Sequence, residues 1–237
     1  MSYNFDILLA DLKINIKCKY EYLHGFCKDY LSQNDSTDIY AETCDADIEK
    51  ENTLVPSAPA FVCESLCVYR SIGEQLPQFN RFVFHGAAIE YNGGAYIFTA
   101  PSGTGKTTHI NLWKENLGDK VNIINGDKPI IKVDDISTVY GTPWAGKENL
   151  QRNSKAPIKC ICVIAQAKQN KIYRLSKSEA VTHLMRQVYI PKNQEALKKT
   201  LELFGKLIEN VPVFMLECDI SNEAFEVSYN KLTKEVV

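Results

Sequence analysis

The stretch of this chain whose residue types could do chemistry is FTAPSGTGKTTHINLW, residues 98–113. It contains Gly-Lys-Thr as a phosphate-binding loop (Walker A, G-x-x-x-x-G-K-[ST]) does, but Ala100 occupies the position of the first glycine. The strand before the loop leaves the sheet at this position, and alanine tolerates most of the backbone angles needed there. Gly-Lys-[Ser/Thr] arises by chance in roughly one chain in ten of this length. We therefore rely on its setting, between an apolar run and a helical segment.

Each residue of the loop has a physical role in binding a nucleoside triphosphate. Gly103 and Gly105 permit positive φ, which lets backbone N–H groups approach phosphate oxygens. Lys106 reaches the β- and γ-phosphates, and the Thr107 hydroxyl is a ligand for Mg²⁺. The alternative is a glycine-rich turn that caps an ordinary helix. We predict that ATP and Mg²⁺ bind on Ser102, Gly103, Thr104, Gly105, Lys106, Thr107 and Thr108.

A Mg²⁺–nucleotide site usually needs a carboxylate at the end of a neighbouring strand. The sequence VNIINGDKP supplies Asp127 directly after an apolar run. We predict that Asp127 binds the metal, accepts the proton of the acceptor hydroxyl, or does both; the alternative is an ordinary turn residue. Asp134 and Asp135 lie between two apolar runs, as the turn residues of a hairpin do, and we do not expect them to bind metal.

Residues 142–153, TPWAGKENLQRN, combine an aromatic side chain with two cations and a flexible glycine. Such a loop can fold over a nucleotide, and its cations can neutralise the charge that develops as a phosphoryl group moves. Trp144, Lys147 and Arg152 are therefore candidate substrate-binding and charge-screening residues. The alternative is a solvated surface loop with a half-buried tryptophan.

The elements that must position these residues divide the chain into two parts. We predict a small β-rich N-terminal unit over residues 1–58 and a P-loop kinase-like domain over residues 59–237. The first part contains two strand-like segments, one segment that is strand or loop, and a polar, proline-rich connection. These are residues 3–17 and 37–48, residues 20–35, and residues 49–60.

The second part alternates helical and strand-like patterns. Residues 61–76 have the apolar spacing of an amphipathic helix. Residues 81–92 and 95–100 are strand-like on either side of an Asn-Gly turn, which indicates a hairpin, and a helix follows the loop over 107–117. The pattern predicts a mixed α/β fold with antiparallel hairpins and crossover helices. Further strands are predicted over 120–126, 129–133, 137–144, 158–167 and 212–218, and further helices over 176–189, 193–211 and from Ser221 onward.

The composition is that of an ordinary globular protein, with 45% hydrophobic and 24% charged residues. A formal net charge of −2 gives no overall attraction to nucleic acid or to an anionic membrane. The N-terminus lacks the pattern of a signal peptide, and no apolar stretch is long enough to span a bilayer. We therefore expect a cytoplasmic protein without nucleic-acid or membrane partners.

The eight cysteines have irregular spacings, which favours reduced thiols over disulfides in a chain of this length. Two close pairs exist, and a four-cysteine zinc site that joins them is the alternative. We favour free thiols, because cysteine is among the most buried residue types. The pairs are Cys63 with Cys67 and Cys160 with Cys162.

The stretch FHGAAIEYNGGAYIFTAPSGTGKTT resembles HPr kinase/phosphorylases, in which a His-Gly pair precedes a glycine-turned hairpin and then the loop. PSGTGKTT also closely matches the loop of ATP-dependent phosphoenolpyruvate carboxykinases. The chain is similar to small HPr-kinase-like proteins often found near peptide-modification genes, best from Arg81 to Asp127. The resemblance implies an α/β P-loop domain of the HPr kinase/phosphoenolpyruvate carboxykinase type, with a mixed parallel and antiparallel sheet and a small β-rich N-terminal unit.

The resemblance also implies roles for particular residues. Lys106 and Thr107 would bind phosphate and Mg²⁺. His85 would lie beside the γ-phosphate or the acceptor, and Asp127 would bind metal, activate the acceptor hydroxyl, or do both. From the residues alone, a histidine at a strand end is more simply structural. HPr kinases carry two consecutive aspartates where this chain has Gly126-Asp127, so one carboxylate is missing here.

We predict an ATP-dependent kinase that phosphorylates a hydroxyl, with Asp127, Lys106 and His85 as catalytic residues. The resemblance implies Ser or Thr of a peptide or small protein as the acceptor, and a small molecule such as free serine is the alternative acceptor. A hypothesis of another class is a nucleotide-binding regulatory or scaffold module of a peptide-modification system. A transferase that uses phosphoenolpyruvate or pyrophosphate is a third. The oligomeric state is left open, a homo-oligomer included.

Overall fold

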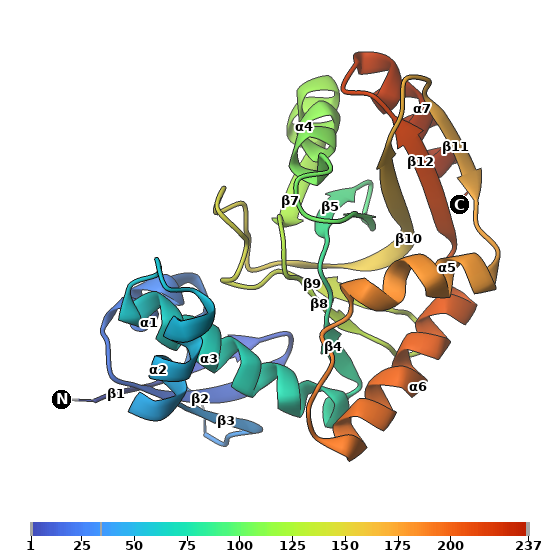
Figure 1. Ribbon diagram of the computed structural model, residues 1–237. Coiled ribbons are helices and arrows are strands. Elements are labelled where there is room, and N and C mark those ends of the chain that lie inside the picture. The colour runs from blue at the N-terminus through green and yellow to red at the C-terminus, as the bar shows by residue number, and fades with distance from the viewer. Residues whose placement is uncertain (1, 34, 236–237) are drawn as a thin grey trace.

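The computed structural model describes residues 2–33 and 35–235 and has a mixed α/β fold with two β-sheets (Figure 1). The smaller, N-terminal sheet has three strands in the order β1-β2-β3, and the larger has nine. In the small sheet β1 and β2 are antiparallel, whereas β2 and β3 are parallel. Its strands are β1 (Tyr3–Leu9), β2 (Leu12–Cys18) and β3 (Ile39–Glu42).

The single strand predicted over residues 3–17 is a hairpin, formed by β1 and β2. Its turn residues Ala10 and Asp11 both have positive φ, 52° and 59°. An alanine in such a turn departs from the usual glycine and asparagine, which is why the sequence pattern hides the turn. β3 confirms a strand within residues 37–48.

Two predictions for the N-terminal part are wrong because helices form there. Residues 20–35, predicted as strand or loop, contain α1 (Tyr22–Phe26) and the 3-10 turn η1 (Lys28–Tyr30). The connection predicted over residues 49–60 is occupied in its first half by α2 (Asp45–Leu54). Two aspartates in the first turn of α2 complement its helix dipole.

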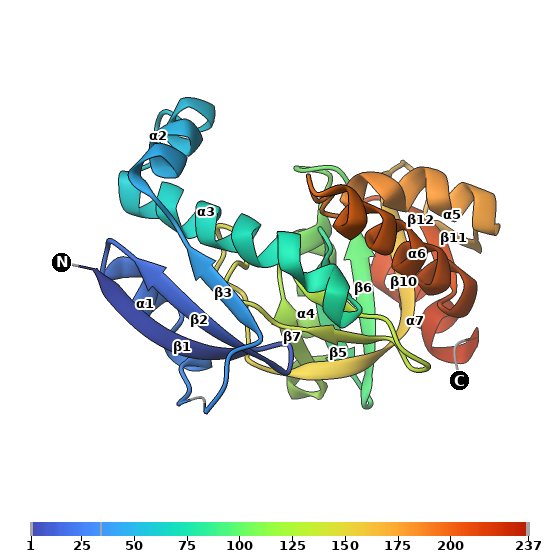
Figure 2. The ribbon, with the colours of Figure 1, turned by 90° about the horizontal axis from the view of Figure 1, so that it is seen from below.

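Helix α3 (Ala60–Gln75) confirms the amphipathic helix predicted over residues 61–76. In Figure 2 it extends from the small sheet toward the large one. Its buried residues Val68, Tyr69 and Ile72 join one apolar cluster that contains the small sheet and also Trp144 from the larger part. This shared core holds the two parts together, and the boundary between residues 58 and 59 stays a prediction.

The large sheet has the strand order β4-β8-β9-β10-β6-β5-β7, with β12 beside β10 and β11 beside β12. β10 runs parallel to both β6 and β12, and β5 is antiparallel to β6 and to β7. Parallel neighbours place their carboxyl ends at one edge of the sheet, where ligands usually bind in such folds. The strands are β4 (Arg81–Val83), β5 (Ala87–Tyr91), β6 (Gly94–Thr99), β7 (Val121–Asn125), β8 (Ile130–Lys132), β9 (Thr138–Tyr140), β10 (Lys155–Gln166), β11 (Lys171–Arg174) and β12 (Val213–Cys218).

The two hairpins predicted in this part are confirmed. Asn92 and Gly93 turn the chain between β5 and β6 with positive φ, 50° and 74°. Asp134 and Asp135 lie in the turn between β8 and β9, which are antiparallel. The sequence patterns miss β11, a short strand without buried residues that pairs only with β12.

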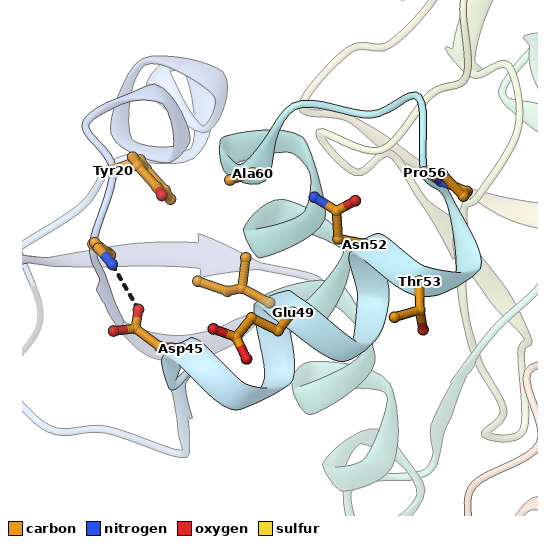
Figure 3. Close-up of a pocket in the computed structure, with 9 residues that line it drawn as sticks. Tyr20, Asp45, Glu49, Asn52, Thr53, Pro56 and Ala60 are labelled. Carbon is orange, nitrogen blue, oxygen red and sulfur yellow. Dashed lines mark hydrogen bonds and ion pairs between the residues drawn. The ribbon is translucent and has the colours of Figure 1, made fainter.

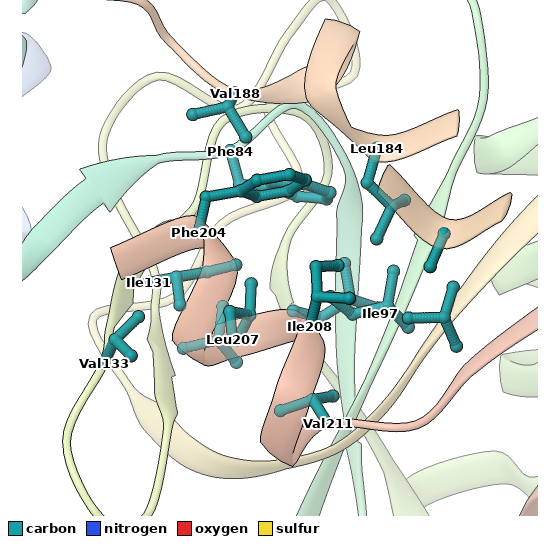
Figure 4. Close-up of a cluster of buried hydrophobic side chains, with 14 of the residues drawn as sticks. Phe84, Ile97, Ile131, Val133, Leu184, Val188, Phe204, Leu207, Ile208 and Val211 are labelled. Carbon is teal, nitrogen blue, oxygen red and sulfur yellow. The ribbon is translucent and has the colours of Figure 1, made fainter. Parts of the chain in front are cut away.

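Helices cover both faces of the large sheet (Figure 1). On one face α4 and α7 pack with Trp113, Phe98 and Phe225 at their centre. On the other face α5 and α6 pack on a second cluster, where Phe204, Leu207 and Ile208 of α6 lie against the sheet (Figure 4). The helices are α4 (Lys106–Leu117), α5 (Lys177–Leu184), α6 (Gln194–Asn210) and α7 (Asn222–Glu235).

All eight cysteines are free thiols, and Cys63, Cys160 and Cys162 are fully buried. Within residues 2–33 and 35–235, no three His, Cys, Asp or Glu side chains gather where they could hold a metal ion. In the same residues no helix has the length and apolar character needed to cross a bilayer.

Candidate active site

The Gly-Lys-Thr loop joins β6 to α4 at the carboxyl edge of the parallel strands. Gly103 and Gly105 have positive φ, 79° and 116°, and Gly105 is the residue that caps α4. A Cβ on either glycine would meet no atom within 4 Å, so the backbone angle, and not lack of space, requires glycine there. The first turn of α4 has unpaired N–H groups at the same point. The loop therefore presents N–H donors to an anion.

Lys106 is the buried cation of this loop. Its side chain is only 8% exposed, and Nζ donates a hydrogen bond to the Ala100 carbonyl, 2.9 Å away. Burial lowers the pKa of Lys106, although the charge of Asp127 partly counters this. A lysine ammonium has three donors, so the bond to Ala100 leaves donors for phosphate oxygens.

Asp127 and His85 form a pair beside the loop. Asp127 Oδ1 lies 3.1 Å from His85 Nε2, and its Oδ2 forms an ion pair with Lys128. Burial raises the pKa of Asp127, but hydrogen bonds from His85 and Lys128 outweigh it and lower the pKa to about 2. Asp127 is therefore an ionised carboxylate throughout the neutral pH range.

A buried asparagine builds the turn that presents Asp127. Asn125 is inaccessible to solvent, and its Oδ1 accepts hydrogen bonds from the N–H groups of Asp127 (2.8 Å) and Lys128 (2.7 Å). Its Nδ2 donates to the Thr142 carbonyl at 3.0 Å. The Asp127 carbonyl in turn accepts from Gly86 N–H at 2.9 Å, which joins this turn to the approach to β5. Asp127 is thus held through its N–H by Asn125, through its carbonyl by Gly86 and through its carboxylate by His85 and Lys128.

Close packing explains why glycine stands before Asp127. A Cβ on Gly126 would lie 3.1 Å from the Ala145 carbonyl oxygen and 3.3 Å from Leu150 Cβ. A second aspartate at this position would need the 144–150 segment to move. On the other side, a Cβ on Gly146, which has φ of 79°, would lie 3.1 Å from Asp127 Cβ. Close packing on both sides of the turn therefore disfavours a second carboxylate beside Asp127.

The loop and Asp127 line the same cleft, whose volume is about 710 Å³. Its other walls come from the 144–149 segment and from apolar side chains of α1 and α3, among them Tyr22, Phe26 and Leu66. Arg152 and Thr104 are not among its lining residues. The Arg152 side chain donates to Asn122 Oδ1 (2.8 Å), and Thr104 lies on the far side of the loop. The predicted site residues that do line it are His85, Ser102, Gly103, Gly105, Lys106, Thr107, Thr108, Asp127, Trp144 and Lys147.

The family model described as "SynChlorMet cassette protein ScmC" matches residues 62–232. The chain belongs to the ScmC family. The match contains the loop, His85 and Asp127, and it leaves out the three strands of the small sheet. Among curated proteins no match was found. Among solved structures, the chain is similar to the Hpr(Ser) kinase/phosphatase from Coxiella burnetii with 9% identity and a TM-score of 0.37, over 64% of this chain and 97% of that chain.

Trp144 of this ScmC family member is a fixed part of the cleft wall. Its side chain is 6% exposed, and Nε1 donates to Ser65 Oγ at 3.0 Å. Its ring packs against those of Phe26 and Tyr69, with centroids 6.0 and 5.4 Å away. The tryptophan is therefore buried and not half-buried, whereas residues 146–149 of the same loop are exposed, as the alternative of a solvated loop expected. Lys147 directly follows Gly146 and is exposed at the mouth of the cleft.

Two side-chain partners of the Asp127–His85 pair, Lys128 and Gln187, were not predicted from the sequence. Lys128 pairs with Asp127, and its position directly after that aspartate in NGDKP was a signal that could have revealed it. Gln187 contacts His85 twice: its Oε1 lies 2.8 Å from Nδ1, and its carbonyl accepts from His85 N–H at 2.7 Å. No sequence pattern connects residues so far apart in the chain. Together these contacts fix both the backbone and the ring of His85.

A second hollow, of about 570 Å³, lies between α2, the start of α3 and the segment after β2 (Figure 3). Lys19 and Asp45 in its wall pair with each other at 2.7 Å. Figure 3 shows Glu49 and Asn52 of α2 along the same wall. No residue of the loop lines this hollow, and its cation, Lys19, is paired with Asp45. The cleft at the sheet edge is therefore the candidate active site.

Proposed function

We propose that this protein is an ATP-dependent kinase that transfers the γ-phosphoryl group to a hydroxyl, and that residues 59–237 form a P-loop domain of the HPr kinase/phosphoenolpyruvate carboxykinase type. The observation that supports this best is that Lys106, Asp127 and His85 line one cleft. A phosphate-binding loop alone would suit any nucleotide-binding protein. An ionised carboxylate beside the loop can also act on an incoming hydroxyl.

In this proposal the triphosphate lies on residues 102–108 and ATP is the phosphoryl donor. The N–H groups of the loop and of the first turn of α4 bind phosphate oxygens. Lys106 donates to the β- and γ-phosphates with the donors that the Ala100 carbonyl leaves free. Its burial excludes water and so strengthens this electrostatic interaction.

The residues present fit Mg²⁺ as the metal. In proteins Mg²⁺ keeps several waters and takes one or two carboxylates together with substrate phosphate oxygens. Asp127 and the Thr107 hydroxyl supply such a donor set from two sides of the cleft. When bound, the ion would neutralise negative charge on the phosphates.

Asp127 orients the acceptor hydroxyl and takes up its proton. A carboxylate with a pKa of about 2 is a weak base. In a loose transition state, however, the phosphoryl group has largely left ADP before its bond to the acceptor oxygen forms. The hydroxyl therefore does not need a strong base early in the reaction. His85 holds Oδ1 of Asp127 and so positions the carboxylate. Lys147, at the mouth of the cleft, screens the charge of the moving phosphoryl group.

The acceptor we propose is a Ser or Thr side chain of a peptide or small protein. The wall formed by Tyr22, Phe26 and Leu66 offers apolar surface on which a peptide could lie. Because the family is described as a cassette protein, peptides encoded in the same cassette are the first substrates to test. Free serine would use the same catalytic groups without this wall.

The test is incubation of the protein with ATP, Mg²⁺ and such a peptide, followed by mass spectrometry for an added phosphate. Asp127→Asn should abolish phosphorylation and leave ATP binding, whereas Lys106→Ala should weaken both. Lys114→Ala, a partly exposed lysine later in α4 that does not line the cleft, is the matched control and should change neither. ATP binding by the wild type without ADP formation, with cassette peptides and with free serine, would contradict the kinase proposal.

A second candidate function is a nucleotide-binding regulatory or scaffold module with little turnover. The observation that favours it is the single carboxylate at this turn, where close packing at Gly126 disfavours a second one. In that case the wild type would show little ATP turnover, and Asp127→Asn would not lower it further. Binding of a partner protein would instead depend on bound nucleotide.

A further inference from the structure

A second cavity lies at the same edge of the sheet, on the opposite side of the loop from Asp127. It has a volume of about 190 Å³ and is lined by the ends of β10 and β12 and by the first turns of α4. Gly105 and Thr108 line both this cavity and the cleft. The loop therefore separates two neighbouring hollows and touches both.

The order of the strands gives the two hollows different chemistry. Across the edge the strands follow one another as β7, β5, β6, β10 and β12, with β12 beside β10. Asp127 follows β7 and His85 precedes β5, so both ionisable groups stand on one side of β6 and its loop. Gln166 ends β10 and Cys218 ends β12, on the other side. The phosphoryl-transfer groups and the second cavity thus flank the loop.

The surface of the second cavity is mostly uncharged. Burial lowers the pKa of His109 to about 4 and raises that of Cys218 to about 11, so both side chains are neutral at pH 7. Leu112 and Ile164 add apolar surface. Ile220 lies at the rim with 77% of its surface exposed, although most apolar side chains of this size in the protein are buried. A flat apolar ring would cover it.

The volume limits what the cavity can take. Pockets for drug-sized molecules measure about 300–1,000 Å³, so a hollow of about 190 Å³ suits a single small ring system. At the rim, hydrogen bonds from Ser221 keep the pKa of Asp219 below its usual range, so this carboxylate is an ionised acceptor. An acceptor at the edge of an apolar slot suits the amino group of a nucleobase.

We infer that this cavity, between Leu112, Ile164 and Ile220, binds the base of the nucleoside triphosphate. The inference rests on the proposed function, because it needs the phosphates on the loop. With the γ-phosphate toward Asp127 and His85, the chain of phosphates runs along the loop and leaves it on the side of Thr108. The base then reaches the second cavity, and the apolar wall of the cleft at Tyr22 and Phe26 is left for the acceptor.

The experiment compares the binding of Mg·ATP and of Mg·tripolyphosphate, which has no base, by titration calorimetry. Wild type should bind ATP at least about tenfold more tightly than tripolyphosphate. Ile220→Glu should remove most of this difference and leave the affinity for tripolyphosphate unchanged. Ile136→Glu is the matched control, because Ile136 is also an exposed isoleucine (70%) but lies in the β8–β9 turn. It should change neither affinity.

A second variant tests the cavity from Ala167, the residue that follows β10. Ala167→Phe should fill it and lower the affinity for ATP but not for tripolyphosphate. Equal affinities of the wild type for the two ligands, or an unchanged affinity for ATP in both Ile220→Glu and Ala167→Phe, would overturn the inference while the phosphate site stands. If the wild type binds neither ligand, the proposed function fails, and the inference fails with it.

Discussion

The loop side of the site and the Asp127 side are held in place in different ways. The loop side is one continuous segment between β6 and α4, and its shape follows from two glycines with positive φ. The Asp127 side is assembled from distant segments: Asn125 bonds to Thr142, and His85 bonds to Gln187. The loop side should therefore tolerate changes elsewhere in the chain, whereas the position of Asp127 depends on contacts across the fold.

The largest effect that separates the two sides is expected for Asn125→Ala. It leaves the buried N–H groups of Asp127 and Lys128 without their acceptor, which should lower the free energy of unfolding by about 3 kcal/mol. Phosphoryl transfer should fall at least about tenfold because Asp127 is no longer oriented. The affinity for tripolyphosphate, a property of the loop, should change less than about twofold. Urea unfolding and calorimetry measure these quantities.

The control is Asn122→Ala on the same strand. Asn122 is only partly buried, and its loss should cost about 1 kcal/mol or less. If the two variants lost equal stability, the buried turn at Asn125 would have no special role. If tripolyphosphate binding fell together with transfer, the two sides would not be independent.

Asp127→Asn should have a smaller effect on stability, and that effect should depend on pH. In the folded protein the pKa of Asp127 is lowered from its ordinary 3.8 to about 2. A lowered pKa contributes stability that is present above about pH 4 and lost as the pH falls to about 2. The substitution should cost about 1–2 kcal/mol at pH 7, and the gap to wild type should close between pH 4 and pH 2. Urea unfolding over this pH range is the measurement, and a constant gap would contradict it.

Gly126→Ala tests the close packing beside Asp127. The new Cβ would lie 3.1 Å from the Ala145 carbonyl, so we expect a loss of about 1 kcal/mol in unfolding free energy. Gly205→Ala is the control: Gly205 lies within α6 with no atom within 4 Å of the added Cβ, and the change should stabilise the protein by about 0.5–1 kcal/mol. Thermal unfolding of both variants should show shifts of opposite sign. Equal shifts would mean that the 144–150 segment yields without cost.

The smallest effect is expected at the mouth of the cleft. Lys147→Ala should lower the rate of transfer about threefold, since Lys147 is exposed and its charge is screened by water. Arg152→Ala should leave the rate unchanged, because Arg152 pairs with Asn122 outside the cleft. Steady-state kinetics at low ionic strength is the measurement. A larger loss for Arg152→Ala than for Lys147→Ala would reverse this assignment.

Much of the large sheet could be predicted from the sequence because its signals are local. Asn92-Gly93 and Asp134-Asp135 are turns between apolar runs, and both hairpins form. The N-terminal part was harder to predict because its local signals are weak. Its hairpin turns at Ala10-Asp11 without a glycine, and α2 begins on aspartates that also suit loops. There, packing against α3 decides the structure more than local propensity does.

By itself the sequence determined the loop, with its two glycines of positive φ and Lys106, and it placed Asp127 directly after a strand. Only the tertiary structure decided what surrounds them: Gln187 on His85, Asn125 beneath Asp127, and the second cavity beyond Thr108. The physical reason is the sequence separation between the interacting residues. A turn or a helix start depends on dihedral angles within a few residues, whereas a buried polar group takes its partners from whichever strand the sheet brings beside it.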